Sequence, residues 1–261
     1  MKLLCLTKYT RRGPSSRYRV YQFLPYLERA GIDIDIQTLH DDSYLQRIFS
    51  GKRPSLPYLL RRASKRTWAL LRARRYDLVL IQKELFPRAP DIFETFLRWT
   101  GVDFVFDFDD AIFVLYEDMR SPLTGALLKN KIPRVIARSR LVLAGNEFLA
   151  DYARRYSQRV VRFPTVVDTD RFSPGERART PGKPVVGWMG SPETVGFIED
   201  IREPLEDLGR KMVFELRLVG ADPVRVDGVA VTSRPWNEAD EVEELRQFDV
   251  GIMPLPMSRW A

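Results

Sequence analysis

The sequence alternates between short apolar runs and amphipathic stretches, and this alternation constrains the fold more than any other feature. Runs such as KLLCLTK, IDIDIQTL and VDFVFDFDD are typical of buried strands. Stretches with the helical spacing of apolar residues follow them. The alternation predicts an α/β chain with a parallel sheet covered by helices, because parallel strands need crossover connections. Ligands of such sheets bind at the carboxyl ends of the strands.

One segment interrupts this pattern. RFSPGERARTPGKP is rich in proline, glycine and charge, which is typical of a domain linker. Strands and helices resume after it. We therefore predict two Rossmann-like domains with parallel sheets, at 1–172 and 184–261, joined by a linker at 173–183. The second domain is expected to be incomplete, because no helix follows to cover the buried strand VGIMPL; a complete small domain is the alternative.

Composition narrows the class of protein. The chain of 261 residues is 44% apolar and 30% charged, which predicts a globular protein rather than a disordered one. No apolar run approaches the roughly 18–20 residues of a membrane-spanning helix, and the opening apolar run is too short for a signal peptide. We therefore predict a cytoplasmic protein. The single Cys5 and single His40 exclude an internal disulfide and a two-histidine zinc site.

Four segments resemble those of family-four-type glycosyltransferases, which have the GT-B fold. In chain order they are GPSSRYRVYQFLPYL, then VLAGNEFLADYA with FPTVVDTDRF, then VVGWMGSPETVGFI, and finally FDVGIMPLPMSRWA. The resemblance covers nearly the whole chain and implies a C-terminally truncated member. It implies an acceptor-binding first domain, a donor-binding second domain and a cleft between them. It also implies transfer of a sugar from a nucleotide-sugar without a metal or other cofactor.

The resemblance places site residues on loops that follow strands. The first loop would touch the donor phosphates or the acceptor, with a plain surface turn as the alternative. In the second domain, backbone amides and a hydroxyl would hold the diphosphate. An indole would stack on the nucleobase or, alternatively, cover the sheet edge. The residues expected to bind donor or acceptor are Gly13, Ser15, Ser16, Arg17, Asn146, Glu147, Gly187, Gly190, Ser191 and Trp236.

The stretch DFVFDFDD contains an Asp-x-Asp, which suggests a metal site of the GT-A type. Its position in the first of two Rossmann-like halves argues against that interpretation. We expect Asp107 to be structural, with a hydrogen-bond partner or a place near the strand end. Asp109 and Asp110 lie at the carboxyl edge and are the candidate catalytic residues, orienting the acceptor hydroxyl or accepting its proton. A structural role in satisfying loop amides is the alternative.

Basic residues gather in the first third of the chain. Between Lys52 and Arg75 there are nine basic residues and no acidic ones. The helix predicted over 58–75 places leucines on one face and cations on the other, which suggests docking on anionic lipid. An ordinary solvated face is the alternative, and nucleic-acid binding is not expected because no recognition motif is present. The proposed membrane contacts are Arg61, Arg62, Lys65 and Arg66.

Two features weaken the prediction of catalysis. GSPETVGFIED lacks the basic residues that many family members use to neutralise the diphosphate, and the Glu-x7-Glu region is absent. The main prediction is a glycosyltransferase fragment, retaining and inactive by itself, from cell-envelope or polysaccharide biosynthesis, peripheral on the inner face of the membrane. Its acceptor would be a glycan or a lipid-linked sugar. The alternative is a non-catalytic nucleotide-sugar or glycan binding module of the same fold.

Overall fold

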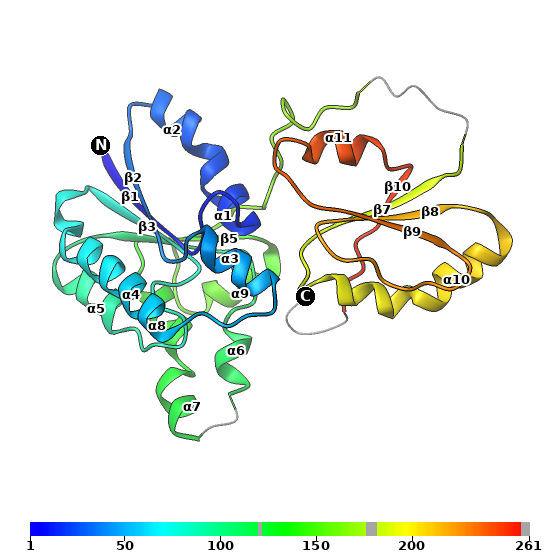
Figure 1. Ribbon diagram of the computed structural model, residues 1–261. Helices are drawn as coiled ribbons and strands as arrows, with labels where there is room; N and C mark the ends of the chain where they lie inside the picture. The colour runs from blue at the N-terminus through cyan, green and yellow to red at the C-terminus, as the bar shows by residue number, and fades with distance from the viewer. Residues whose placement is uncertain (120–121, 176–181, 257–261) are drawn as a thin grey trace. The chain divides into compact units, whose positions relative to one another are not determined.

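The computed structural model describes residues 1–119, 122–175 and 182–256. The chain divides into two compact units, the first Met1–Val167 and the second beginning at Asp168 (Figure 1). This division precedes the predicted linker at 173–183, of which 176–181 lie outside the described residues. We describe each unit by itself.

The first unit is built on a six-stranded sheet in which every strand pair is parallel, in the order β2-β1-β3-β4-β5-β6. This confirms the predicted α/β class with a parallel sheet. The strands are β1 (Lys2–Thr7), β2 (Asp33–Thr38), β3 (Leu78–Gln82), β4 (Phe104–Phe108), β5 (Leu141–Ala144) and β6 (Val160–Arg162). The helices are α1 (Pro14–Arg19), α2 (Leu24–Arg29), α3 (Asp42–Phe49), α4 (Leu56–Leu71), α5 (Ile92–Trp99), α6 (Val114–Glu117), α7 (Pro122–Leu128), α8 (Lys131–Arg138) and α9 (Glu147–Arg154), with 3-10 turns η1 (Tyr21–Phe23) and η2 (Ala73–Arg75).

The strand order sets where ligands can bind. β1 pairs with β2 on one side and with β3 on the other, so the direction of strand addition reverses between β1 and β3. In open parallel sheets this reversal leaves a crevice at the carboxyl ends of the two strands. The residues that follow Thr7 and Gln82 therefore stand at the topological switch point of the first unit.

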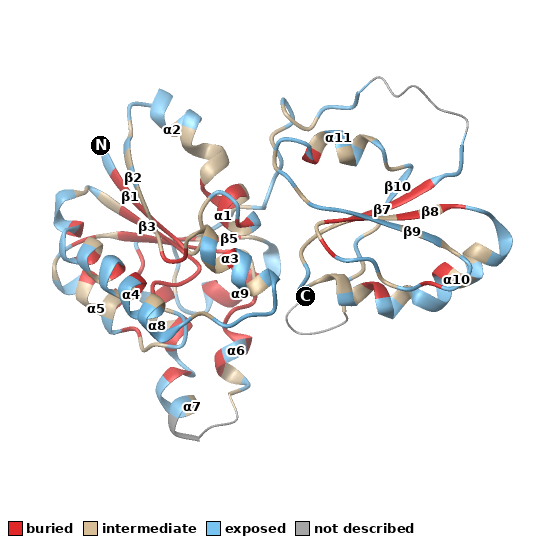
Figure 2. Cartoon of the chain, viewed as in Figure 1, coloured by how far each residue is buried: buried red, intermediate tan, exposed pale blue. Residues whose placement is uncertain are grey.

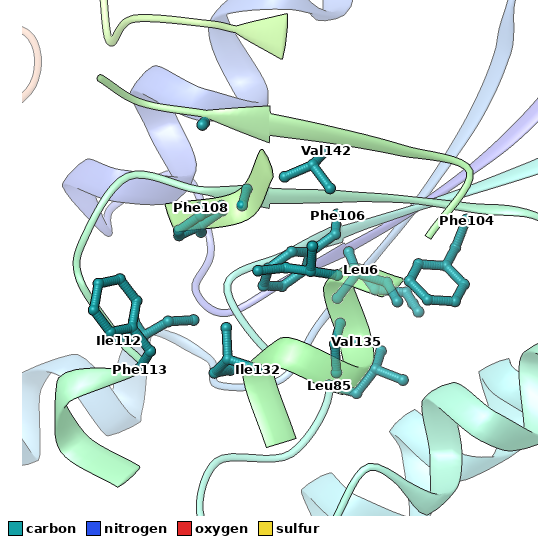
Figure 3. Packing of buried hydrophobic residues seen from close by; sticks show 14 of the residues in the cluster. Leu6, Leu85, Phe104, Phe106, Phe108, Ile112, Phe113, Ile132, Val135 and Val142 are labelled. Atoms are coloured by element: carbon teal, nitrogen blue, oxygen red, sulfur yellow. The ribbon is translucent and has the colours of Figure 1, made fainter. Parts of the chain in front are cut away.

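The core of the first unit forms around β4. The three phenylalanines of this strand, Phe104, Phe106 and Phe108, are fully buried among aliphatic side chains from β1, β5 and α8 (Figure 3). Helices α4, α5 and α8 cover this face, while α1 and α2 cover the opposite face, where Cys5 is buried (Figure 1). Burial raises the pKa of the Cys5 thiol to about 12, so Cys5 has the packing role of a small apolar residue.

The second unit contains a four-stranded sheet, again with every pair parallel, in the order β10-β7-β8-β9. Its core contains Trp188, Phe214 and Leu216, all buried. Figure 2 shows the buried segments of this unit along β7 and β8. The strands are β7 (Val185–Met189), β8 (Glu215–Val219), β9 (Ala230–Arg234) and β10 (Val250–Gly251). The helices are α10 (Arg202–Lys211) and α11 (Glu241–Arg246), with a 3-10 segment η3 (Val195–Ile201).

Proline positions correct two predicted helices. The single helix expected at 20–31 is instead η1 followed by the shorter α2, and the segment expected as a loop before it contains α1. Pro14 and Pro25 lie in the first turns of α1 and α2. Proline has no backbone N–H, so it fits a first turn and disrupts a helix interior. For the same reason the helix expected around Pro204 begins only at Arg202, after η3.

The orientation of α4 corrects a further prediction. Leu60 and Leu71 are 61% and 62% exposed, whereas Arg62 and Arg66 are buried. Arg62 donates hydrogen bonds to the carbonyl oxygens of Leu39 (2.7 Å) and Thr38 (2.6 Å), and Arg66 donates to that of Thr7 (2.5 Å). The two guanidinium groups thus supply donors to carbonyl groups at the ends of β1 and β2. The prediction that Arg62 and Arg66 contact a membrane is therefore wrong.

Candidate functional site

The loop between β1 and α1 is fixed by a buried hydroxyl. Ser16 accepts a hydrogen bond from the Tyr9 amide (3.1 Å) and donates one to Gln82 Oε1 (2.9 Å), which also accepts from the Lys8 amide (3.0 Å). Gly13 fits this loop because a Cβ there would lie 2.4 Å from Cβ of Tyr9. These hydrogen bonds connect the loop to the end of β3, and the Ser16 hydroxyl makes two of them.

The other two residues expected in this loop differ in exposure. Ser15 is half-buried, while Arg17 is buried and its guanidinium lies 4.9 Å from the centre of the Tyr18 ring. Their predicted contacts with donor or acceptor stay predictions.

Asp107, near the end of β4, pairs with Arg19 of α1, and both side chains are buried. Arg19 donates from Nε to Asp107 Oδ2 (3.2 Å) and from Nη2 to Oδ1, and it also donates to the carbonyl oxygen of Phe163 (2.5 Å). Burial raises the pKa of Asp107 to about 6, and the hydrogen bonds and charge of Arg19 oppose this shift by favouring the ionised carboxylate. The expected hydrogen-bond partner of Asp107 is confirmed.

Asp109 and Asp110 share one lysine. Lys83 Nζ lies 3.3 Å from Asp109 Oδ1 and contacts Asp110 Oδ2. Burial lowers the pKa of Lys83, but the two carboxylates raise it more, so the ammonium stays charged. The side chain of Asp109 is 16% exposed and that of Asp110 is 37% exposed. Of the two candidate catalytic residues, Asp110 is thus the more accessible.

Sequence reasoning missed Lys83. Its backbone has φ of 66°, in the left-handed region that residues other than glycine rarely adopt, and its amide donates to the Asp107 carbonyl oxygen (2.7 Å). Non-glycine residues in this region cluster at functional sites. The signal was a lysine placed directly after the buried strand β3, at the edge where ligands bind.

The loop after β5 lies against the loop after β4. A Cβ on Gly145 would lie 2.9 Å from Cα of Asp109, so glycine permits this close approach. Asn146 caps α9, because its Oδ1 accepts from the Leu149 amide (2.9 Å). Glu147 pairs with Arg154 (2.5 Å). The structure shows local roles for Asn146 and Glu147, and their predicted binding role stays a prediction.

The described residues contain no group of three or more His, Cys, Asp or Glu side chains placed to hold a metal ion. Within the Asp-x-Asp, Asp107 faces Arg19 and Asp109 faces Lys83. Each carboxylate therefore has a basic side chain as its partner.

Three loops meet at the carboxyl edge of the second sheet. Gly190 follows β7, Gly220 follows β8 and Trp236 follows β9. A Cβ on Gly220, whose φ is 96°, would lie 2.2 Å from the Gly190 carbonyl oxygen and 3.2 Å from Cβ of Trp236. The half-buried indole of Trp236 donates to Glu241 Oε1 (3.3 Å). Sequence reasoning identified Gly190 and Trp236 but missed Gly220, although VGAD follows a buried strand.

The other two residues expected in the donor site, Ser191 and Gly187, both have local structural roles. The Ser191 amide donates to Thr194 Oγ1 (3.3 Å), so this amide is used at the start of the following turn. Gly187 is inside β7, paired with β8 and β10, and a Cβ there would lie 2.0 Å from the ring of Phe248. Gly187 therefore has a packing role, and we leave it out of the donor site proposed below.

Comparison with known proteins identifies a fold. No family model matches the sequence, and no curated protein matches it. Solved structures do match. UDP-GlcNAc 2-epimerase from Neisseria meningitidis, bound to UDP-GlcNAc, superposes with a TM-score of 0.58 at 13% identity, over 96% of this chain and 76% of that chain.

Two transferases superpose similarly. An alpha-glucosyltransferase in complex with UDP and a DNA 13-mer gives a TM-score of 0.55 at 11% identity, over 96% of this chain and 71% of the other. The lipopolysaccharide outer core galactosyltransferase WaaB gives a TM-score of 0.51 at 13% identity, over 95% of this chain and 72% of that chain. The chain therefore has the GT-B fold with two Rossmann-like domains, which confirms the predicted fold class.

Proposed function

We propose that the protein is a glycosyltransferase of the GT-B fold, of the family-four type, that uses a nucleotide-sugar donor. The observation that carries the proposal is the presence of two parallel sheets, each with a cluster of polar or aromatic groups at its carboxyl edge. Structures of this fold contain UDP and UDP-GlcNAc. The proposal assigns the donor to the second unit and the acceptor to the first.

The donor would lie at the meeting point of Gly190, Gly220 and Trp236. Backbone close to the two glycines would approach the diphosphate, and the indole would stack on the nucleobase. The proposal needs no metal, because the departing diphosphate would be stabilised by backbone amides and cations. A retaining outcome follows the resemblance to family-four-type enzymes.

On the acceptor side, Asp110 is the best placed carboxylate. Its side chain is 37% exposed and is held by Lys83, which has a second contact with Asp109. A carboxylate held in this way can accept a hydrogen bond from the acceptor hydroxyl and orient it for attack. Lys83 would act as a positioning residue. We place the reaction in glycan or lipid-linked sugar synthesis at the cytoplasmic face of a membrane.

The exposed side of α4 supports the membrane contact in a revised form. We define the α4 outer face as Leu56, Leu60, Arg61, Lys65, Trp68, Leu71 and Arg72, all exposed. Arg72 lies 3.5 Å from the centre of the Trp68 ring. A groove of about 780 Å³ between α4 and β2 adjoins this face and is lined by Trp68 and Lys65 among others. Leucines and an indole among cations suit an interface helix that lies on anionic lipid. No described helix has the length and apolarity to cross a bilayer.

The experiment that tests the function measures UDP binding and hydrolysis across a panel of nucleotide-sugars. Trp236→Ala should weaken UDP binding by about 5- to 150-fold, because base stacking on an aromatic side chain contributes about 1–3 kcal/mol. Trp99→Ala, which changes an indole that is 84% exposed on α5, is the matched control. Absence of binding to every nucleotide and nucleotide-sugar would overturn the proposal.

A non-catalytic binding module is the second candidate. The loop after β7 favours it, because Gly190–Ile198 contains no lysine or arginine to neutralise a diphosphate. Binding of a nucleotide-sugar without hydrolysis or transfer would support this alternative over an enzyme.

A further inference from the structure

Lys8 stands at the switch point of the first sheet, and its side chain has no role in the site described above. It follows β1 directly, and its half-buried ammonium lies 5.2 Å from the centre of the Tyr9 ring. Among the described residues, no carboxylate lies within ion-pair distance of Lys8 Nζ. A charged group removed from water in this way needs a counter-charge from elsewhere.

The surroundings of Lys8 disfavour its charged form on balance. Burial lowers its pKa first and the neighbouring Lys83 second, and these outweigh the opposing effects of Glu84 and Asp110. Asp110 is already paired with Lys83. On the other side, the amide of the buried His40 donates to the Lys8 carbonyl oxygen (3.0 Å). Burial, followed by the charge of Lys8, lowers the pKa of His40 to about 4, so the imidazole is neutral at pH 7.

We propose that Lys8 binds a phosphoryl group of the acceptor in the crevice between β1 and β3. Ligands of open parallel sheets bind at this reversal of strand order, and a lysine ammonium binds phosphate as a point charge. Lys83 is unsuited to the task because two carboxylates already neutralise it. The anchored phosphoryl group would lie beside Asp110, which the proposed function uses to orient the acceptor hydroxyl. The inference therefore rests on the proposed function and specifies its acceptor as a phosphorylated one.

A phosphoryl group could also belong to the donor diphosphate. The shared chemistry is an anionic phosphate oxygen bound to Lys8, and the two sources differ in the probe that they prefer. A hexose 1-phosphate represents an acceptor, UDP represents the donor, and inorganic phosphate reports the anion site by itself.

His40 is the sole histidine of the sequence, so its ring protons give one assignable set of signals in a proton NMR spectrum. The test titrates inorganic phosphate, hexose 1-phosphate and UDP separately into the 261-residue chain at pH 7. We expect saturable shifts of the His40 signals with phosphate and hexose 1-phosphate. Lys8→Met should weaken both affinities by about tenfold or more, because a hydrogen bond to a charged group is lost. Lys52→Met, at an exposed lysine, should leave them unchanged.

Each other result has a defined meaning. Unchanged His40 signals, or equal affinities in Lys8→Met and the wild type, would mean an adventitious ion only and would overturn the inference. Tighter Lys8-dependent binding of UDP than of hexose 1-phosphate would assign the site to the donor and overturn the acceptor assignment. Lys8→Gln provides a second variant if Lys8→Met does not fold. Phosphate binding at Lys8 without any UDP binding would uphold the anion site while the proposed function fails.

Discussion

Lys83 illustrates how a single side chain organises the first unit's candidate site. Its ammonium is the shared counter-charge of Asp109 and Asp110, which are adjacent in the chain. Its left-handed backbone directs the chain away from β3 at the edge where ligands bind. The aspartates were recognisable in the sequence because they follow a run of apolar residues. The lysine also directly follows a buried strand, but its pairing with the aspartates was not recognisable, because they follow a different strand.

Lys83→Met should destabilise the protein by about 1–3 kcal/mol, because the largely buried Asp109 loses its charged partner while solvent screens the more exposed Asp110. Urea unfolding followed by circular dichroism measures this change. Lys52→Met is the control, since that lysine is exposed. A Lys83→Met variant as stable as the wild type would contradict the described ion pairs.

Glu94 makes stability depend on pH. It is buried on α5, and burial raises its pKa to about 7, with Lys131 opposing the shift. Because the folded-state pKa lies above the unfolded value, stability from this group is fully present below about pH 4.5 and is lost as pH rises through about 7. Glu94→Gln removes this dependence.

The unfolding free energy of Glu94→Gln should therefore exceed that of the wild type by a larger margin at pH 8 than at pH 5, the two margins differing by about 2–3 kcal/mol. Glu28→Gln, at an exposed glutamate on α2, serves as the control. An equal difference between Glu94→Gln and the wild type at both pH values would refute the raised pKa.

At the scale of one element, α4 shows what periodicity can and cannot predict. The spacing of apolar residues correctly indicated a helix, and its bounds of Leu56–Leu71 fall close to the expected 58–75. The prediction of which helix face is buried was wrong, because Arg62 and Arg66 donate hydrogen bonds to carbonyl oxygens at the ends of neighbouring strands. The positions of those carbonyl groups depend on the fold of the sheet, so the helix sequence alone cannot predict these hydrogen bonds.

The two buried arginines of α4 should respond differently to replacement by methionine. Arg62→Met should cost about 1–3 kcal/mol, because the Leu39 carbonyl oxygen loses its donor. Arg66 Nε and Nη1 have no hydrogen-bond partner, and the Thr7 carbonyl oxygen also accepts from the Leu39 amide (2.9 Å). Arg66→Met should therefore be neutral or stabilising, because a poorly paired buried charge is removed. Thermal unfolding compares the two variants, and a larger loss in Arg66→Met would contradict this account.

The α4 outer face should bind anionic vesicles through both its charges and its apolar side chains. Charge reversal at Arg61, Lys65 and Arg72 should reduce co-sedimentation with phosphatidylserine vesicles by tenfold or more, since each cation near such a surface contributes about 1 kcal/mol. Trp68→Ser with Leu60→Ser should reduce it further. Charge reversal at Arg29, Arg47 and Lys52 is the control. Equal binding by the α4 variants and the wild type would rule out this face as the contact.

At the scale of the whole molecule, two parallel sheets in two units were predictable from the sequence. Alternation of strands and helices and the Pro- and Gly-rich interruption are local patterns, and the structure confirms the α/β class with the GT-B fold. The contact-defined division before Asp168 was not predictable from composition. Residues 168–175 are mostly polar, as in a linker, but Arg171 pairs with Glu241 of α11 (3.1 Å) in the second unit.

The strands, most helices, the parallel connectivity and the polar residues at the strand ends can be predicted from the amino-acid sequence, because they depend on periodicity and residue type within a short window. The three-dimensional fold was needed to show which strands are neighbours, and therefore that the switch point lies between β1 and β3. It also shows that Lys83 pairs with Asp109 and Asp110, Arg19 with Asp107, and Gly220 with the loops of Gly190 and Trp236. These contacts join segments far apart in the chain, and their energies depend on burial and distance, which a linear pattern does not contain.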